Sequence, residues 1–254
     1  SGIQAGTYVA AITTGSEGVN VTKFQLSKAA TSALTDTTLT FFKATGNYNI
    51  GIGGYTLDAL TTGHSNVALG YNALTAATDG NSNVCIGRNA GQSITGAGGA
   101  VAIGYAALAT EDASGTSVAV GYTALEDQNV NSNANVAVGY KAGTNLTTGT
   151  NSVFLGYQSG GVAIVTGSYN IGLGADSAKN LTSGQYNVAI GSSALSVAAT
   201  NSDNTAIGHN ALANVTAEDN VAIGSRAMKY STSTSDCVAV GRNALGGDGT
   251  TAPT

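Results

Sequence analysis

One short pattern of apolar and polar positions recurs twelve times along the chain and closes each time on a glycine. In its commonest form Asn precedes a β-branched residue, a small residue, a second aliphatic residue and the glycine, as at residues 66–70 and 187–191. Apolar residues at alternate positions predict a short β-strand at each copy. The closing glycines are 16 to 18 residues apart, which predicts an internally repeated structure.

A second element follows each glycine. Two variable residues precede a small one, usually Ala, and often a Leu, as at residues 71–74 and 122–125. A turn rich in Thr, Asn, Asp and Gly completes the repeat, so we expect a strand, a glycine bend, a second short strand and a polar turn. Seventeen residues cannot form a packed core alone, so neighbouring repeats must stack.

These repeats predict an all-β fold, a parallel β-solenoid (β-roll) of about twelve 17-residue turns at residues 45–247. Residues 1–44 lack the pattern and are expected to form a small N-terminal β module that caps the first turn, and residues 248–254 are expected to be a C-terminal tail. So short a remainder after Gly241 suggests either a piece of a longer protein or an end that stacks on a neighbour.

The strand residues divide between two faces, because side chains alternate along a strand. We expect the two larger aliphatic residues to fill the solenoid interior and the small residue between them to face outward. A uniformly small, apolar outward face permits close approach of another copy around a symmetry axis, and we predict a homotrimer. The predicted interface consists of Ala68, Ala102, Ala119, Ala137, Phe154, Ala189, Ala206, Ala222 and Ala239.

Composition narrows the function classes. Only 9% of the 254 residues are charged, Gly occurs 36 times, and the net charge is -5. Nine scattered Lys and Arg residues argue against nucleic-acid binding, and no apolar run is long enough to predict membrane insertion. A hydrophobic fraction of 42% argues against disorder. So little charge is unusual for a catalytic domain and favours a structural protein.

Candidate chemistry is sparse. Cys85 and Cys237 lie nine turns apart, too far for an intrachain disulfide. His64 and His209 also lie in distant repeats, and no His/Cys/Asp cluster has metal-ligand spacing. The acidic pairs at 111–112, 126–127 and 218–219 are expected in solvated outer loops. We therefore predict no catalytic residue, no metal and no cofactor.

The residue after each closing glycine forms a candidate surface-binding ladder, because stacked turns place equivalent positions above one another. Its members in the second to seventh repeats are Tyr71, Arg88, Tyr105, Tyr122, Tyr140 and Tyr157. The ladder is interpreted either as aromatic packing along the edge of the roll or as an exposed stripe for binding sugar or protein. The Asn residues before the strands predict a second ladder, of side-chain amides bonded along the stack.

The sequence Asn-Val-Ala-Ile-Gly at 187–191 and 220–224, followed after two intervening residues by Ala, resembles the head repeats of trimeric autotransporter adhesins, which are left-handed parallel β-rolls. Similar glycine-rich repeats occur in trimeric phage tail-fibre shafts. The period here is longer than in adhesin heads. Residues 6–13 and 38–42 resemble small β modules of phage and viral structural proteins. The resemblance implies a trimer at a virion surface or in an extracellular setting.

We therefore expect a non-enzymatic homotrimer that serves as a segment of a phage-type tail fibre or spike and contacts a glycan or protein receptor on a host surface. Two alternatives stay open. A bacterial trimeric surface adhesin head would have the same architecture but would be anchored to a cell, and a self-assembling extracellular filament subunit would stack end to end.

Overall fold

The computed structural model describes residues 48–96, 98–111, 116–128, 134–230, 233 and 235–246. Over these ranges the chain is an all-β parallel solenoid, as the repeats predict. The predicted N-terminal module at 1–44 and the tail at 248–254 lie outside the described residues. The twelve three-residue strands of the solenoid are β1 (Ile50–Ile52), β2 (Val67–Leu69), β3 (Val84–Ile86), β4 (Val101–Ile103), β5 (Val118–Val120), β6 (Val136–Val138), β7 (Val153–Leu155), β8 (Ile171–Leu173), β9 (Val188–Ile190), β10 (Thr205–Ile207), β11 (Val221–Ile223) and β12 (Val238–Val240).

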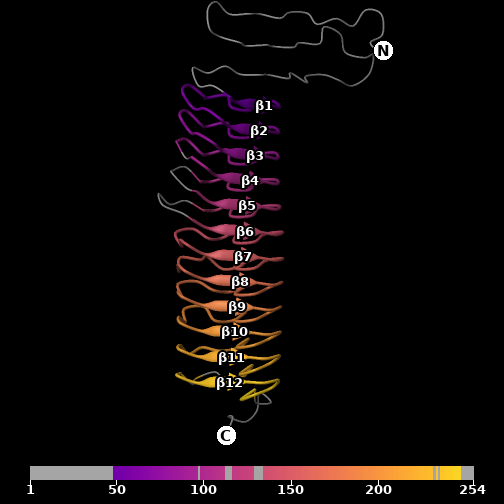
Figure 1. Cartoon of the computed structure of the whole chain (residues 1–254), viewed down its shortest axis with the longest axis vertical. Helices are drawn as coiled ribbons and strands as arrows, with labels where there is room; N and C mark the ends of the chain where they lie inside the picture. The colour runs from indigo at the N-terminus through magenta and orange to yellow at the C-terminus, as the bar shows by residue number, and fades with distance from the viewer. Residues whose placement is uncertain are drawn as a thin grey trace, which may run out of the picture.

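The strands form one parallel sheet in sequence order, from β1 to β12. Each strand pairs in register with the next, so that Val67 lies beside Val84 and Ala68 beside Cys85. Figure 1 shows the strands stacked along the long axis with their arrows pointing the same way. Because every turn repeats the register of the one before, each position in the repeat becomes a column that runs the length of the rod.

The glycine that closes each strand is required by its backbone conformation. At Gly208 φ is 134°, in a region that residues with a side chain rarely adopt. A Cβ atom at this position would lie 2.6 Å from the backbone carbonyl carbon of Gly224 in the next turn. The glycine column therefore allows the backbones of successive turns to approach closely at the bend.

The second element of the repeat is a series of turns, and the prediction of a second short strand is wrong for the described residues. Alternate residues adopt the left-handed conformation, for example Asn72 with φ 55° and Leu74 with φ 50°. The backbone still pairs between turns: the Leu74 amide donates to the Ala90 carbonyl at 3.0 Å. These hydrogen bonds hold the turns at the same spacing as the sheet on the opposite side.

The asparagine ladder is confirmed. The amide N–H of Asn83 donates to Oδ1 of Asn66, and that of Ala100 donates to Oδ1 of Asn83, both at 2.9 Å. The side-chain Nδ2 of Asn66 donates to the carbonyl of Gly80 at 2.8 Å. These asparagines are fully buried, so each side chain satisfies backbone groups that the narrow interior removes from water.

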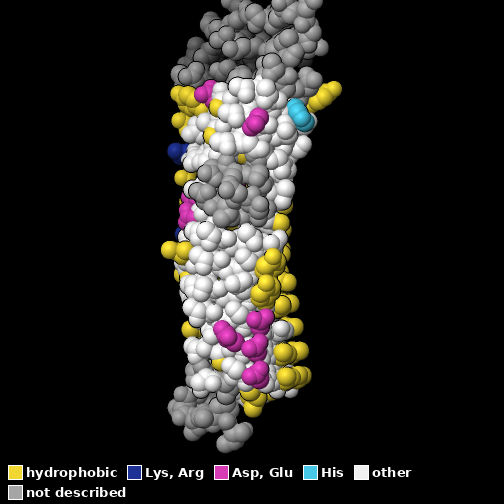
Figure 2. All heavy atoms as spheres, turned by 90° about the vertical axis from the view of Figure 1, so that its left-hand side faces the viewer, with side chains coloured by type: hydrophobic (Ala, Val, Ile, Leu, Met, Phe, Trp, Pro, Cys, Tyr) yellow, Lys and Arg dark blue, Asp and Glu magenta, His cyan; other side chains and the backbone are white. Residues whose placement is uncertain are grey.

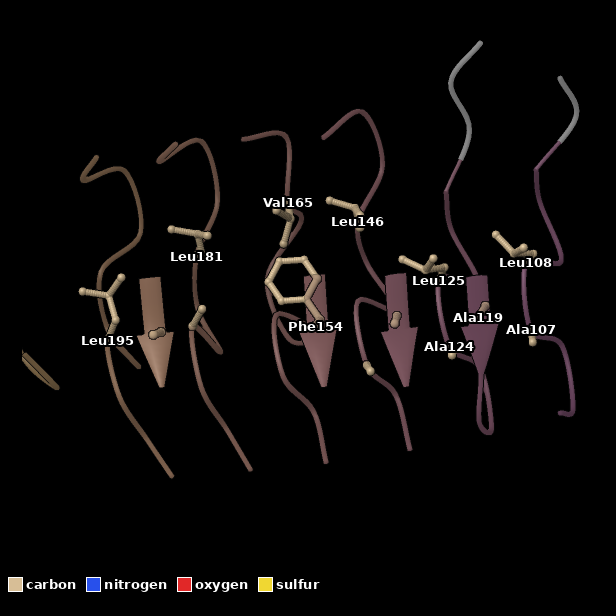
Figure 3. Packing of buried hydrophobic residues seen from close by; sticks show 14 of the residues in the cluster. Ala107, Leu108, Ala119, Ala124, Leu125, Leu146, Phe154, Val165, Leu181 and Leu195 are labelled. Atoms are coloured by element: carbon tan, nitrogen blue, oxygen red, sulfur yellow. The ribbon is translucent and has the colours of Figure 1, made fainter. Parts of the chain in front are cut away.

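The middle residue of each strand points into the interior, and the prediction that it faces outward is wrong. All nine side chains of the predicted trimer interface are buried within one chain: Ala68, Ala102, Ala119, Ala137, Phe154, Ala189, Ala206, Ala222 and Ala239. The reason is the thinness of the roll. Buried leucines of the second element already occupy most of the interior, which leaves room for little more than a methyl group on the strand (Figure 3).

Two strand residues in this column, Cys85 and Phe154, are larger than alanine. They fit because the second element of the same turn carries a glycine opposite them. Turns that carry Ala in the strand generally carry Leu or another side chain four residues after the closing glycine, as Leu125 does. The turns of Cys85 and Phe154 instead carry Gly91 and Gly160 there. A Cβ at Gly91 would lie 2.6 Å from Cys85 Sγ, and one at Gly160 would overlap the ring of Phe154. The ring of Phe154 also fills space in the adjacent turns, because a Cβ at Gly143 would lie 3.4 Å from it and one at Gly172 would lie 2.9 Å from it. Interior volume is thus compensated between a large residue and the glycines around it.

This compensation predicts a measurable coupling between positions 154 and 160. Phe154→Ala should destabilise the protein by roughly 3–5 kcal/mol because it leaves a cavity, and Gly160→Leu by about 1–3 kcal/mol because it overpacks the interior. The double variant recreates the Ala–Leu combination found in other turns, such as Ala119 with Leu125, and should recover more than about 1 kcal/mol of the summed loss. Thermal unfolding at fixed protein concentration measures this difference. Additive losses would contradict the proposed packing.

Candidate interaction surface

The first and third residues of each strand form an apolar outer sheet face, a term used here for these residues of β1–β12. Two positions on each of twelve strands give 24 residues, of which 23 are Val, Ile or Leu and one is Thr205. Every one is half-buried or exposed, and Val240 at the last strand retains 67% of its accessible surface. The larger aliphatic residues, predicted to fill the interior, therefore cover the outside of the sheet.

The outer sheet face is continuous along the rod. In Figure 2 exposed hydrophobic side chains follow one border of the molecule over much of its length. Eleven steps of about 4.8 Å give a height of about 53 Å, and three strand residues span about 10 Å, so the apolar stripe covers on the order of 500 Å². This is as large as the largest apolar patch on a typical monomeric protein, and such patches are often interaction sites.

The ladder that begins at Tyr71 lies along one border of this face, two residues after each strand. Its tyrosines are exposed, retaining 39% to 52% of their accessible surface. The rings of Tyr105, Tyr122 and Tyr140 stack with centroids 5.0 and 5.4 Å apart, and Tyr157 continues the stack at 5.3 Å. The Arg88 guanidinium bridges the gap in the stack, 5.9 Å from the ring centroids of both Tyr71 and Tyr105.

This stacking restricts what the ladder can bind. Interplanar angles of 9° to 15° mean that each ring covers the face of its neighbour. The faces on which a sugar ring would stack are therefore occupied within the column, and ring edges and hydroxyl groups point outward. Such an edge suits packing against another protein surface better than stacking on a glycan.

A second border, two residues before each strand, was missed by the sequence reasoning. Tyr169 and Tyr186 stack there with centroids 5.0 Å apart. The same position in the last three turns carries Asp203, Asp219 and Asp236, all exposed. Figure 2 shows acidic side chains gathered beside the hydrophobic border in the half nearer β12. The outer sheet face is thus bounded on both sides by columns of exposed residues.

One of the predicted acidic loop residues is an interior residue instead. Glu111 is fully buried, and its Oε2 accepts a hydrogen bond of 2.6 Å from Nε2 of Gln128 in the next turn. Gln128 also bonds Ser117 Oγ at 2.9 Å and accepts from Asn135 Nδ2 at 2.9 Å. The prediction of solvated loop charge is therefore wrong for Glu111. Its carboxylate belongs to a polar cluster that spans adjacent turns inside the roll.

Partial burial raises the pKa of the neighbouring Glu126 carboxyl, and the charge of Asp127 raises it further while Lys141 lowers it. A hollow of about 390 Å³ near the last turn is lined by Arg226, Lys229, Tyr230, Asn243 and Gly246, which include two cations and no carboxylate. Nothing in this lining provides a nucleophile with an adjacent base.

The described residues contain neither a cluster of metal ligands nor a membrane-spanning helix. Among these residues no three His, Cys, Asp or Glu side chains lie close enough together to hold a metal ion. The same part of the chain contains no helix that is both long and apolar enough to span a bilayer. Cys85 and Cys237 are both free thiols.

Comparison with known proteins returned no match of the chain to a family model, to a curated protein or to a solved structure.

The sequence did contain a signal for which strand residues face outward. The signal is the spacing between each strand residue and the asparagine before the strand. Asn66 and Ala68 are two residues apart on one strand and must share a face. An asparagine ladder that bonds the backbone of successive turns is best placed in the interior, so the alanine belongs there too. The intervening Val67 and Leu69 then face outward, as the structure has them.

The two thiols should differ sharply in reactivity. Burial raises the pKa of the Cys85 thiol to about 12, so it carries almost no thiolate near neutral pH. Cys237 is partly exposed. Iodoacetamide at pH 8 should therefore label one thiol per native chain and two in urea, as counted by mass spectrometry. Cys237→Ala is the control and should abolish native labelling; two labels on the native protein would contradict the buried position of Cys85.

Proposed function

We propose that this chain is a segment of a non-enzymatic homotrimeric fibre, of the phage tail-fibre or spike type, that reaches a host surface from a virion or in an extracellular setting. The observation that carries the proposal is the continuous apolar outer sheet face. In a single copy, 23 aliphatic side chains along the rod stay in contact with water. Packing of identical faces around a common axis removes all of them from water at once.

The dimensions of the face favour a small closed ring. From one border to the other the face is seven residues wide, at most about 20 Å, because only the three strand residues are fully extended. Three such faces around an axis would lie about 6 Å from it, close to half the ~10 Å spacing of packed sheets. Four faces would lie about 10 Å away and leave a hollow centre. Two faces also satisfy the spacing, and the repeat's resemblance to trimeric fibres favours three.

The area supports a stable assembly. A face up to about 20 Å wide and 53 Å tall offers on the order of 1,000 Å² per copy, which a trimer divides between two neighbours. The total per copy exceeds the roughly 800 Å² that one partner contributes to a standard two-body interface. The hydrogen bonds between turns add mechanical strength, because the amide and carbonyl groups of each strand pair with adjacent turns. Polar turns rich in Thr, Asn and Gly are left on the outside of such a rod to meet a receptor.

The first test is the solution mass of the purified chain by light scattering. A value near three times 24.9 kDa is expected at micromolar concentration. A monomer would overturn the trimer and leave the apolar face without a partner. Species of open-ended size would instead point to a filament that grows end to end.

The second test places charge on the outer sheet face. Val101→Lys combined with Ile103→Lys should convert the trimer to monomers, because each ammonium would be buried against two other copies. The matched control is Ser183→Lys combined with Thr200→Lys, which adds the same charge at exposed turn positions and should leave the mass unchanged. Circular dichroism of both variants separates dissociation from unfolding. A folded trimer that tolerates the face lysines would place the interface elsewhere.

A further inference from the structure

We infer that neighbouring copies meet border to border, with each turn of one copy against the same turn of the next. The inference rests on the proposed assembly and adds to it a direction and a register. The leading border is defined as the residue two positions before each strand, and the trailing border as the residue two positions after it. If copies are related by rotation about an axis parallel to the rod, the leading border of one copy faces the trailing border of the next.

The sizes of the border residues are complementary within each turn. Tyrosine occupies the leading border in three turns, and the trailing residue of the same turn is small in each: Tyr48 with Gly54, Tyr169 with Ala175, and Tyr186 with Ser192. Where the trailing border carries Tyr or Arg in β2 to β7, the leading residue is small or medium: Ser65, Ser82, Gly99, Thr116, Ala134 and Asn151. No turn among the twelve places two aromatic residues at its borders.

The charges are complementary as well. In the turn of β12 the leading residue is Asp236 and the trailing residue is Arg242, and in the turn of β10 they are Asp203 and His209. These four residues are exposed in the single chain. The turn of β11 pairs Asp219 with Ser225, which Arg226 follows directly. Opposite the border of stacked aspartates, the trailing border of the same turns therefore carries the guanidinium of Arg242, the imidazole of His209 and the hydroxyl of Ser225, each able to donate a hydrogen bond to a carboxylate.

Contacts within one chain do not account for this matching. The two borders of a turn lie on opposite sides of the strand, six residues and up to about 20 Å apart. Size compensation inside the roll, as between Phe154 and Gly160, accompanies direct contact. The same relation between two exposed columns that do not touch within the chain indicates contact between chains.

Other arrangements match the borders less well. A shift by one turn would set Tyr157 against Tyr169, two residues that are both already stacked on exposed tyrosines. Antiparallel packing of two copies, face against face, would set like borders together. Tyr140 would then lie against Tyr157, and Arg88 against His209. This packing would also leave Asp236 opposite Tyr48, without a cation. The parallel arrangement in register avoids all of these contacts.

Cysteine cross-linking tests the register directly. In a chain with Cys85→Ala and Cys237→Ala, Asn151→Cys and Tyr157→Cys place one thiol on each border of the β7 turn. A disulfide requires Cα atoms within about 7 Å, so these two thiols cannot bridge within a chain, where the whole strand Val153–Leu155 lies between them. Oxidation with copper phenanthroline should convert most of the protein to a covalent trimer on a denaturing gel.

The matched control combines Asn151→Cys with Tyr71→Cys, which lie on opposite borders but five turns apart. This variant should stay monomeric on the denaturing gel. Efficient cross-linking of the control, or a trimeric solution mass with no cross-link in the β7 pair, would overturn the register while leaving the trimer intact. A monomeric solution mass would instead overturn the proposed function itself, and a covalent product that stops at the dimer would replace the trimer with a parallel dimer.

Discussion

Stacking of equivalent backbone positions in successive turns is the interaction on which this structure depends. The strand amides and carbonyls on one side, and the turn amides on the other, bond to the adjacent turns at the same spacing. A substitution is therefore felt in its own turn and the two beside it, and every surface feature becomes a column. The tyrosine stack, the asparagine ladder and the aspartate column all follow from this one constraint.

The thin interior that results sets strict limits on volume. A turn has room for a methyl group from the strand and one larger side chain from the second element, as Ala119 and Leu125 illustrate. Phe154 fits because Gly160 and Gly172 leave space around its ring. Polar side chains occur in the interior where they form hydrogen bonds between turns, as Glu111 does with Gln128. The interior thereby excludes the larger strand residues and forces them onto the outer sheet face.

That displacement links the fold to the proposed assembly. A roll too thin to bury its own valines and isoleucines presents them as a flat stripe, and copies of the same stripe are the natural cover for it. The borders of the stripe then determine how copies are oriented. The proposed fibre and its proposed register thus arise from the same shortage of interior space.

The sequence alone determined the architecture, because a strand pattern repeated at a nearly constant interval admits few folds besides a stacked solenoid. It also identified the stacking of residues such as Tyr105 and Tyr122, and of Asn66 and Asn83, which follows from periodicity without coordinates. It did not predict which face of the strand points inward. Alternation separates Ala68 from Val67 and Leu69, and the two-residue spacing from Asn66 hints at which set is inside. The volume left by Leu74 and its equivalents is what makes the alanine the inner residue. The turn conformation of the second element and the burial of Glu111 were likewise decided by tertiary structure, since both depend on contacts between turns that no single repeat contains.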